Sequence, residues 1–134
     1  MSGTIVLGYI PSPEGVAAFE RAKDEAARRQ ATLLVVNTGQ DGDFTGRSFA
    51  RPQDLDAIDA ELAAAGIPHE VTQSTASVLP AEEILRLATE RSADLIVIGL
   101  RHRSPVGKLL LGSTAQQVLL DAPCPVLSVQ APRG

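Results

Sequence analysis

The sequence predicts a single α/β domain, a five-stranded parallel sheet with helices on both faces. Short apolar segments rich in strand-forming residues alternate with longer segments whose apolar residues recur every three or four positions. Strands separated by helices pair in parallel, and a parallel sheet is covered on both faces. With 134 residues and 44% hydrophobic side chains, the chain suits one buried core, so residues 1–134 are predicted to form one domain.

Five short segments are predicted to be strands. Four are dominated by apolar side chains, as expected of buried strands. The third alternates polar with apolar residues, which is typical of a sheet edge, and its His69 is expected to face solvent. Pro125 is compatible with the first positions of the last strand. The segments are residues 5–9 (IVLGY), 33–36 (LLVV), 69–73 (HEVTQ), 94–98 (DLIVI) and 124–129 (CPVLSV).

The first helix is predicted over residues 13–29. Ser12 is a favourable N-cap, Pro13 suits the first helical position, and Glu14 lies in the first turn. Apolar residues at helical spacing predict the inward face, which is expected to consist of Val16, Phe19, Ala22 and Ala26.

Three further helices are predicted, over residues 52–65, 81–91 and 113–120. Gly66 follows the first of them at the position where a left-handed residue commonly ends a helix. The segment TGQDGDFTGRSFARP before it has no sustained periodicity and exceeds the usual connection of about 4–6 residues. It is therefore predicted to be a surface loop.

The strand order 3-2-1-4-5 agrees best with the hydrophobic pattern. Right-handed crossovers leave few topologies, and this one places the polar third strand at an edge and the most apolar strands in the centre. Ligands of open parallel sheets bind beyond the carboxyl ends of the strands, where the strand order reverses. That reversal lies between the first and fourth strands, which are followed by Ile10 and Pro11 and by Gly99.

Charge is distributed unevenly. The net charge of −4 leaves no broad basic face, so nucleic acid is not an expected partner. Cations gather locally at Arg101, His102, Arg103 and Lys108. A local basic segment on an acidic protein suits a small anionic ligand, and the alternative is an ordinary solvated loop.

The rest of the composition is typical of a cytoplasmic protein. No apolar run approaches the roughly 18 residues that span a bilayer, and no charged leader precedes a long apolar segment, so no membrane is expected as a partner. The single cysteine, Cys124, lies in an apolar run between two prolines and is expected to behave as a small hydrophobic residue.

A possible phosphate site opens the last predicted helix at Gly112, Ser113 and Thr114. The first N–H groups of a helix have no partner within it, and glycine lets a ligand approach the backbone. The alternative is that Ser113 only caps a helix after a turn glycine.

From residue 93 to residue 129 the sequence resembles the C-terminal half of the universal stress protein family, many members of which bind ATP. Their motif is a glycine, two residues, a glycine, nine residues, then a glycine with serine or threonine. Gly99, Gly112 and Ser113 match it, His102 stands where the second glycine belongs, and the segment SPVGKLLLG is similar as well. The family fold is Rossmann-like, of the adenine nucleotide alpha-hydrolase type, with the same strand order.

The resemblance implies binding of ATP or another adenine nucleotide, with Mg²⁺ as a possible companion. Two departures imply that binding is weak: His102 replaces a glycine, and Ile10 stands where the family has an aspartate that holds the nucleoside. Adenine is expected against Ile10, Pro11 and Val36, and phosphates against Gly99, Arg101, His102, Arg103, Gly112, Ser113 and Thr114.

The resemblance also implies a homodimer joined by the last strand. The segment from Cys124 to Val129 would be an exposed apolar edge in a monomer, and such an edge favours association. Catalysis is not expected, because no nucleophile with an oriented base emerges and Asp94 lies at the start of its strand, at the end opposite the ligand. The rival hypothesis is a dimeric interaction module that binds no nucleotide.

Overall fold

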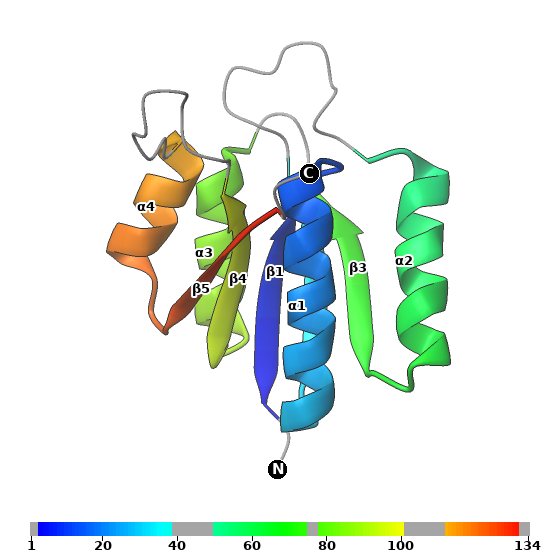
Figure 1. The fold of residues 1–134 in the computed structure, drawn as a ribbon. Coiled ribbons are helices and arrows are strands. Elements are labelled where there is room, and N and C mark those ends of the chain that lie inside the picture. Colours follow the sequence, from blue (N-terminus) through cyan, green and yellow to red (C-terminus); the bar gives the residue numbers. More distant parts are fainter. Residues whose placement is uncertain (1–2, 39–49, 75–77, 101–111, 132–134) are drawn as a thin grey trace.

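The structure is a computed structural model that describes residues 3–38, 50–74, 78–100 and 112–131. Strands and helices alternate along the chain in these residues (Figure 1). In order they are β1 (Thr4–Tyr9), α1 (Pro13–Arg29), β2 (Thr32–Asn37), α2 (Pro52–Ala64), β3 (His69–Gln73), α3 (Pro80–Glu90), β4 (Leu95–Leu100), α4 (Ser113–Asp121) and β5 (Val126–Gln130).

The strands form one parallel sheet in the order β3-β2-β1-β4-β5, which confirms the predicted fold class and topology. Helices α1 and α2 pack on one face, and α3 and α4 pack on the other (Figure 1). All strands run the same way, so their carboxyl ends lie along one edge of the sheet, called here the carboxyl edge. Every helix begins at that edge.

The core has two apolar layers, one on each face of the sheet. Leu7, Leu33 and Val97 lie beneath α1 and α2, whereas Val6 and Ile96 lie beneath α3 and α4. Each of these side chains is fully buried. Burying one aliphatic side chain of this size stabilises the fold by about 1.5–3 kcal/mol, so the central strands β1 and β4 contribute strongly.

Several strand boundaries differ from the prediction by one or two residues, and two of them show how pairing between strands overrides glycine and proline signals. The fourth strand was expected to stop at Ile98, but it continues to Leu100 because Gly99 and Leu100 pair with β5. The last strand begins at Val126 rather than Cys124. Pro125 has no N–H to donate, and it contributes only its carbonyl oxygen, which accepts a hydrogen bond from the Ile96 N–H at 3.0 Å.

Helix α1 begins and ends as predicted but is rotated slightly from the expected packing. The Gly15 N–H donates to the Ser12 hydroxyl at 3.0 Å, so Ser12 is the N-cap. Phe19 is buried, and its ring meets that of Tyr9 edge to face at 6.5 Å between centroids. Val16, expected to face inward, is 49% exposed because Gly15 and Ala18 take the inner positions of that turn.

Candidate functional site

The strand order reverses between β1 and β4, so the carboxyl edge at these two strands is the candidate ligand site. The turn after β1 is held tightly. The Ser12 N–H donates to the Ile10 carbonyl oxygen at 2.9 Å, and a Cβ built on Gly15 would lie 1.8 Å from that oxygen. This packing fixes the backbone of Ile10, which is half-buried, and of Pro11, which is exposed.

The N-terminus of α4 differs from the other three helix N-termini that the structure describes. Each of those three carries a carboxylate in its first turn: Glu14 in α1, Asp54 in α2, and Glu82 with Glu83 in α3. Helix α4 has no acidic residue there. A carboxylate offsets the positive end of the helix dipole and repels an anion. The start of α4 is therefore the most favourable of these four positions for a phosphate.

Gly112, the N-cap of α4, is not required by its backbone or by packing against described residues. Its φ of −67° and ψ of 165° are accessible to any residue. No described atom lies within 4 Å of a Cβ built at this position. Among the described residues, nothing fills the space in front of Gly112, as a phosphate held by backbone N–H groups requires.

Gly99, the first glycine of the motif, is required by packing within the fold. It lies within β4 and faces α1, and a Cβ on it would lie 2.5 Å from the Glu14 carbonyl oxygen. The close approach of α1 to β4 therefore requires glycine here, whether or not a ligand binds. Sequence alone does not separate these two explanations.

The structure places the remaining predicted site residues unequally. Ser113 is exposed and Thr114 is half-buried, both in the first turn of α4. Val36 is 1% exposed within the core beneath α3, so it can offer a ligand little surface. The predicted residues Arg101, His102 and Arg103 lie outside the described residues.

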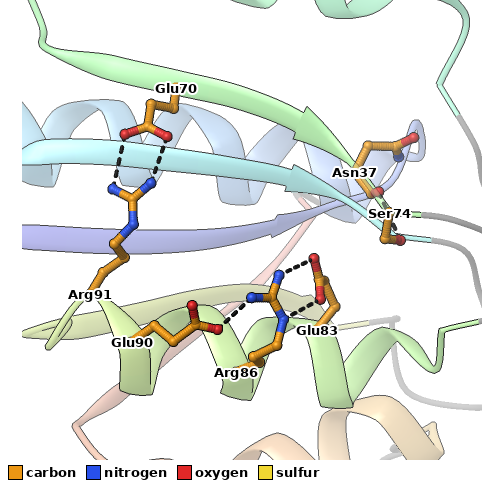
Figure 2. Close-up of polar contacts among 7 residues, drawn as sticks. All are labelled: Asn37, Glu70, Ser74, Glu83, Arg86, Glu90 and Arg91. Atoms are coloured by element: carbon orange, nitrogen blue, oxygen red, sulfur yellow. Dashed lines mark hydrogen bonds and ion pairs between the residues drawn. The ribbon is translucent and has the colours of Figure 1, made fainter.

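A buried polar network at the ends of β2 and β3 was missed by the sequence analysis. Asn37 is completely buried; its Nδ2 donates to the Tyr9 carbonyl oxygen at 2.9 Å, and its Oδ1 accepts from the Ala50 N–H at 2.8 Å. Gln73 Nε2 donates to the same Oδ1 at 2.7 Å. Ser74 Oγ donates to the Asn37 carbonyl oxygen at 3.3 Å, and Figure 2 shows these two residues side by side. The signal available in the sequence was an amide side chain directly after an apolar strand.

Two arginines on the α3 side are engaged in ion pairs. Arg86 donates to Glu83 and also pairs with Glu90, while Arg91 reaches Glu70 on β3 with both terminal nitrogens, at 2.9 and 2.8 Å (Figure 2). Hydrogen bonding to Arg91 lowers the pKa of the Glu70 carboxyl. These contacts join residues of α3 to one another and to β3, so neither arginine is a candidate phosphate ligand.

The contacts of His69 and Asp94, and the burial of Cys124, are explained by the packing of the fold. His69, predicted to face solvent, instead contacts Asp59 on α2, and its side chain is 14% exposed. Asp94 accepts a hydrogen bond from the Thr4 N–H at 2.8 Å, in agreement with its predicted structural role. Burial raises the pKa of the Cys124 thiol, which keeps it protonated and unreactive.

Within the described ranges, no three or more histidine, cysteine, aspartate or glutamate side chains are grouped to hold a metal ion. In the same part of the chain no helix has both the length and the apolar character needed to cross a membrane.

Fold and site together define a doubly wound α/β domain whose candidate ligand site lies at the carboxyl edge between β1 and β4. The model of the universal stress protein family matches residues 1–130. A universal stress protein of Mycolicibacterium smegmatis is 45% identical over 130 residues, covering 97% of this chain and 98% of that protein. The chain belongs to the universal stress protein family.

Solved structures of the family superimpose on nearly the whole chain. A universal stress protein from Archaeoglobus fulgidus has a TM-score of 0.75 at 27% identity, with 96% of this chain and 98% of that chain covered. A universal stress protein in complex with cAMP has a TM-score of 0.69 at 25% identity, with 97% and 98% covered.

Proposed function

We propose that this protein binds an adenine nucleotide at the carboxyl edge between β1 and β4, and that it acts in the cytoplasm as a stress-response protein through nucleotide occupancy rather than catalysis. The observation that carries the proposal is the N-terminus of α4, with its open glycine cap and no carboxylate in the first turn. The related protein in complex with cAMP, an adenine nucleotide, supports the same ligand class. ATP, with or without Mg²⁺, is our first candidate.

The proposed roles follow from residue chemistry. Backbone N–H groups and hydroxyls at the start of α4 would meet the phosphates, with Arg101 and Arg103 supplying charge. Ile10 and Pro11 would pack on the adenine face. Val36, which is 1% exposed, would add little contact surface. Ile10 cannot hold a ribose hydroxyl, and one such lost hydrogen bond weakens binding by about 0.5–1.5 kcal/mol. Binding is therefore expected to be weak.

Calorimetric titration with ATP and Mg²⁺ tests the proposal. We expect heat of binding and thermal stabilisation of the wild type at millimolar ATP, and neither in Gly112→Val, whose branched side chain would occupy the open space before α4. No described atom lies near the new side chain, so the variant without ligand should stay folded and lose only about 1 kcal/mol of the free energy of unfolding, for a poorer N-cap. A wild type that shows neither heat nor stabilisation at millimolar ATP, ADP, AMP or cAMP overturns the proposal.

His102 provides a second test of the same site. If it contacts phosphate, its protonated form donates from both ring nitrogens and adds a charge. Affinity for ATP should then rise as the pH falls from about 8 to about 6, around the reference pKa of about 6.5. Phosphate also gains a proton near pH 6, so the comparison needs His102→Gln, which donates but does not titrate. Identical pH profiles in both proteins would show that His102 makes no such contact.

A second candidate function is a nucleotide-free interaction module, and Ile10 in place of the family aspartate favours it. Mass spectrometry of the purified protein under native conditions distinguishes the two. A nucleotide that copurifies supports binding, whereas a bare protein that also fails the calorimetric test supports the module.

A further inference from the structure

The His69 side chain lies between two oxygen atoms that come from different parts of the fold. Its Nδ1 is 2.7 Å from the Ile67 carbonyl oxygen, and its Nε2 is 2.7 Å from Oδ1 of Asp59 on α2. A carbonyl oxygen only accepts hydrogen bonds, and so does an ionised carboxylate. Both ring nitrogens must therefore carry a proton for both bonds to form. Neutral imidazole has one N–H, so the observed geometry is complete only in the imidazolium form.

We propose that His69 is a proton-operated latch that holds α2 against the edge strand β3. When the ring is doubly protonated, it bridges the carbonyl oxygen of Ile67, in the turn before β3, and the Asp59 carboxylate. When the ring loses a proton, one of these two bonds is lost. The inference concerns conformational control and is independent of the proposed nucleotide site.

Helix α2 is the element that such a latch can affect. Its buried side chains are Ile58 and Leu62, fewer than the six buried residues of α1. A second polar tie joins it to α1, where Lys23 Nζ lies 2.7 Å from Glu61 Oε2. Beside this modest buried face, the bond from His69 to Asp59 is one of the side-chain contacts that tie α2 to its neighbours.

Of the described charged groups on the elements packed around His69, Asp59 is the one that acts on its ring. Asp59 on α2 faces the ring, while Lys23 of α1, the element packed beside α2, is paired with Glu61. Glu70, the next residue of β3, points to the opposite face of the sheet and pairs with Arg91. On β2, the residue that pairs with His69 is Leu33, which carries no charge.

These surroundings set the direction of the pH effect. The Ile67 carbonyl oxygen raises the pKa of His69 above its usual 6.5, Asp59 adds to the increase, and partial burial opposes it. A group whose pKa is raised by folding stabilises the folded state fully below its unfolded pKa and loses that contribution as the pH rises through the folded value. The latch is therefore closed below about pH 6.5 and opens on the alkaline side.

The experiment uses the full chain carrying His102→Gln, in which His69 is the only remaining histidine. NMR titration of the ring gives its pKa directly. Hydrogen exchange at several pH values gives protection factors for α2 amides, and those of α3 amides serve as an internal reference. We expect the ring to titrate above pH 6.5 and the α2-to-α3 protection ratio to fall through the same midpoint. The fall should approach tenfold for each pH unit between the folded and unfolded values.

Three variants make the test selective. Asp59→Asn should lower the His69 midpoint and reduce the pH dependence of α2 protection, whereas Asp56→Asn, which removes an exposed carboxylate from the same helix, should change neither. His69→Gln should make the protection ratio independent of pH. The proposal is overturned if His69 titrates at or below pH 6.5, if the ratio does not change with pH, or if Asp59→Asn and Asp56→Asn behave alike.

Discussion

At the scale of single residues, glycines of one sequence motif occupy their positions for different reasons. Gly99 is required by the backbone of α1, which leaves no room for a Cβ on β4. Gly112 is required by nothing that the described residues show, and the open space before it is the stronger indication of a ligand. The distinction matters because a motif match alone assigns both glycines to ligand binding.

Alanine substitutions separate the two glycines. Gly99→Ala should destabilise the protein by about 1–3 kcal/mol, the usual cost of forcing atoms into a packed contact. Gly112→Ala should cost less, at most about 1 kcal/mol, since its methyl group meets no described atom and only the N-cap preference for glycine is lost. Urea unfolding of the two variants beside the wild type measures both effects. Equal losses in the two variants would contradict this assignment.

Asn37 makes the second prediction at this scale. Asn37→Ala would leave the buried Ala50 N–H without its acceptor, and an unpaired buried donor costs about 1–3 kcal/mol. The loss should appear in the free energy of unfolding. Gln73→Ala is the control, because Gln73 is largely exposed and its removal leaves the Asn37 bonds to Tyr9 and Ala50 in place. If both variants unfold like the wild type, the network does not stabilise the fold.

At the scale of elements, α1 carries a buried carboxylate surrounded by cations. Glu25 is 8% exposed and contacts Arg21, Arg28 and Arg29 within one turn on either side. Burial opposes its ionisation, but the arginines outweigh burial and lower the pKa of the carboxyl below its usual value. Burying an unpaired charge is costly, and the three arginines compensate this cost for the Glu25 carboxylate on the inner side of α1.

This cluster predicts a contribution to acid sensitivity. A carboxyl whose pKa is lowered by folding stabilises the protein above its unfolded pKa, near 4.5, and loses that contribution as the pH falls through the folded value. Glu25→Gln should therefore be less stable than the wild type at neutral pH and should show a shallower loss of stability on acidification. Thermal unfolding from pH 7 to pH 3 measures this, with Glu20→Gln on the exposed face as control.

At the scale of the whole molecule, the open side of β5 is the feature that a second copy would cover. The strand ends the sheet, and nearby surfaces are apolar: Leu120 on α4 is 83% exposed, and a shallow hollow of about 780 Å³ along α1 includes Val16 and Val129. An unpaired apolar edge of this kind favours association. We therefore propose that two chains pair through β5, antiparallel across a two-fold axis.

Light scattering at tens of micromolar protein should report a dimer. The Pro125 carbonyl oxygen accepts from the Ile96 N–H and so faces β4. Backbone polar groups alternate in direction along a strand, so those of Leu127 also face β4 and the Ser128 N–H faces outward. Ser128→Pro removes that outward donor and should give a folded monomer, whereas Ser128→Ala should remain dimeric. A wild-type monomer at this concentration would rule out the dimer.

The sequence by itself determined the order of elements and the topology of the sheet. Periodicity, the Ser12 cap and the left-handed Gly66, with a φ of +72°, act within a few residues, so they can be read without knowing the fold. Contrast between the polar third strand and its apolar neighbours was enough to place β3 at the edge. These features are local or depend on the average burial of a whole strand.

Tertiary structure alone decided how individual side chains are used. The burial of His69 against Asp59, the exposure of Val16, the network around Asn37 and the packing reason for Gly99 depend on elements distant in sequence. Their physical cause is shared: hydrogen bonds and steric contacts are satisfied by whatever neighbour the packed elements supply. A periodic sequence pattern does not specify which residue becomes the contact partner, because that partner depends on how α1 and α2 pack on the sheet.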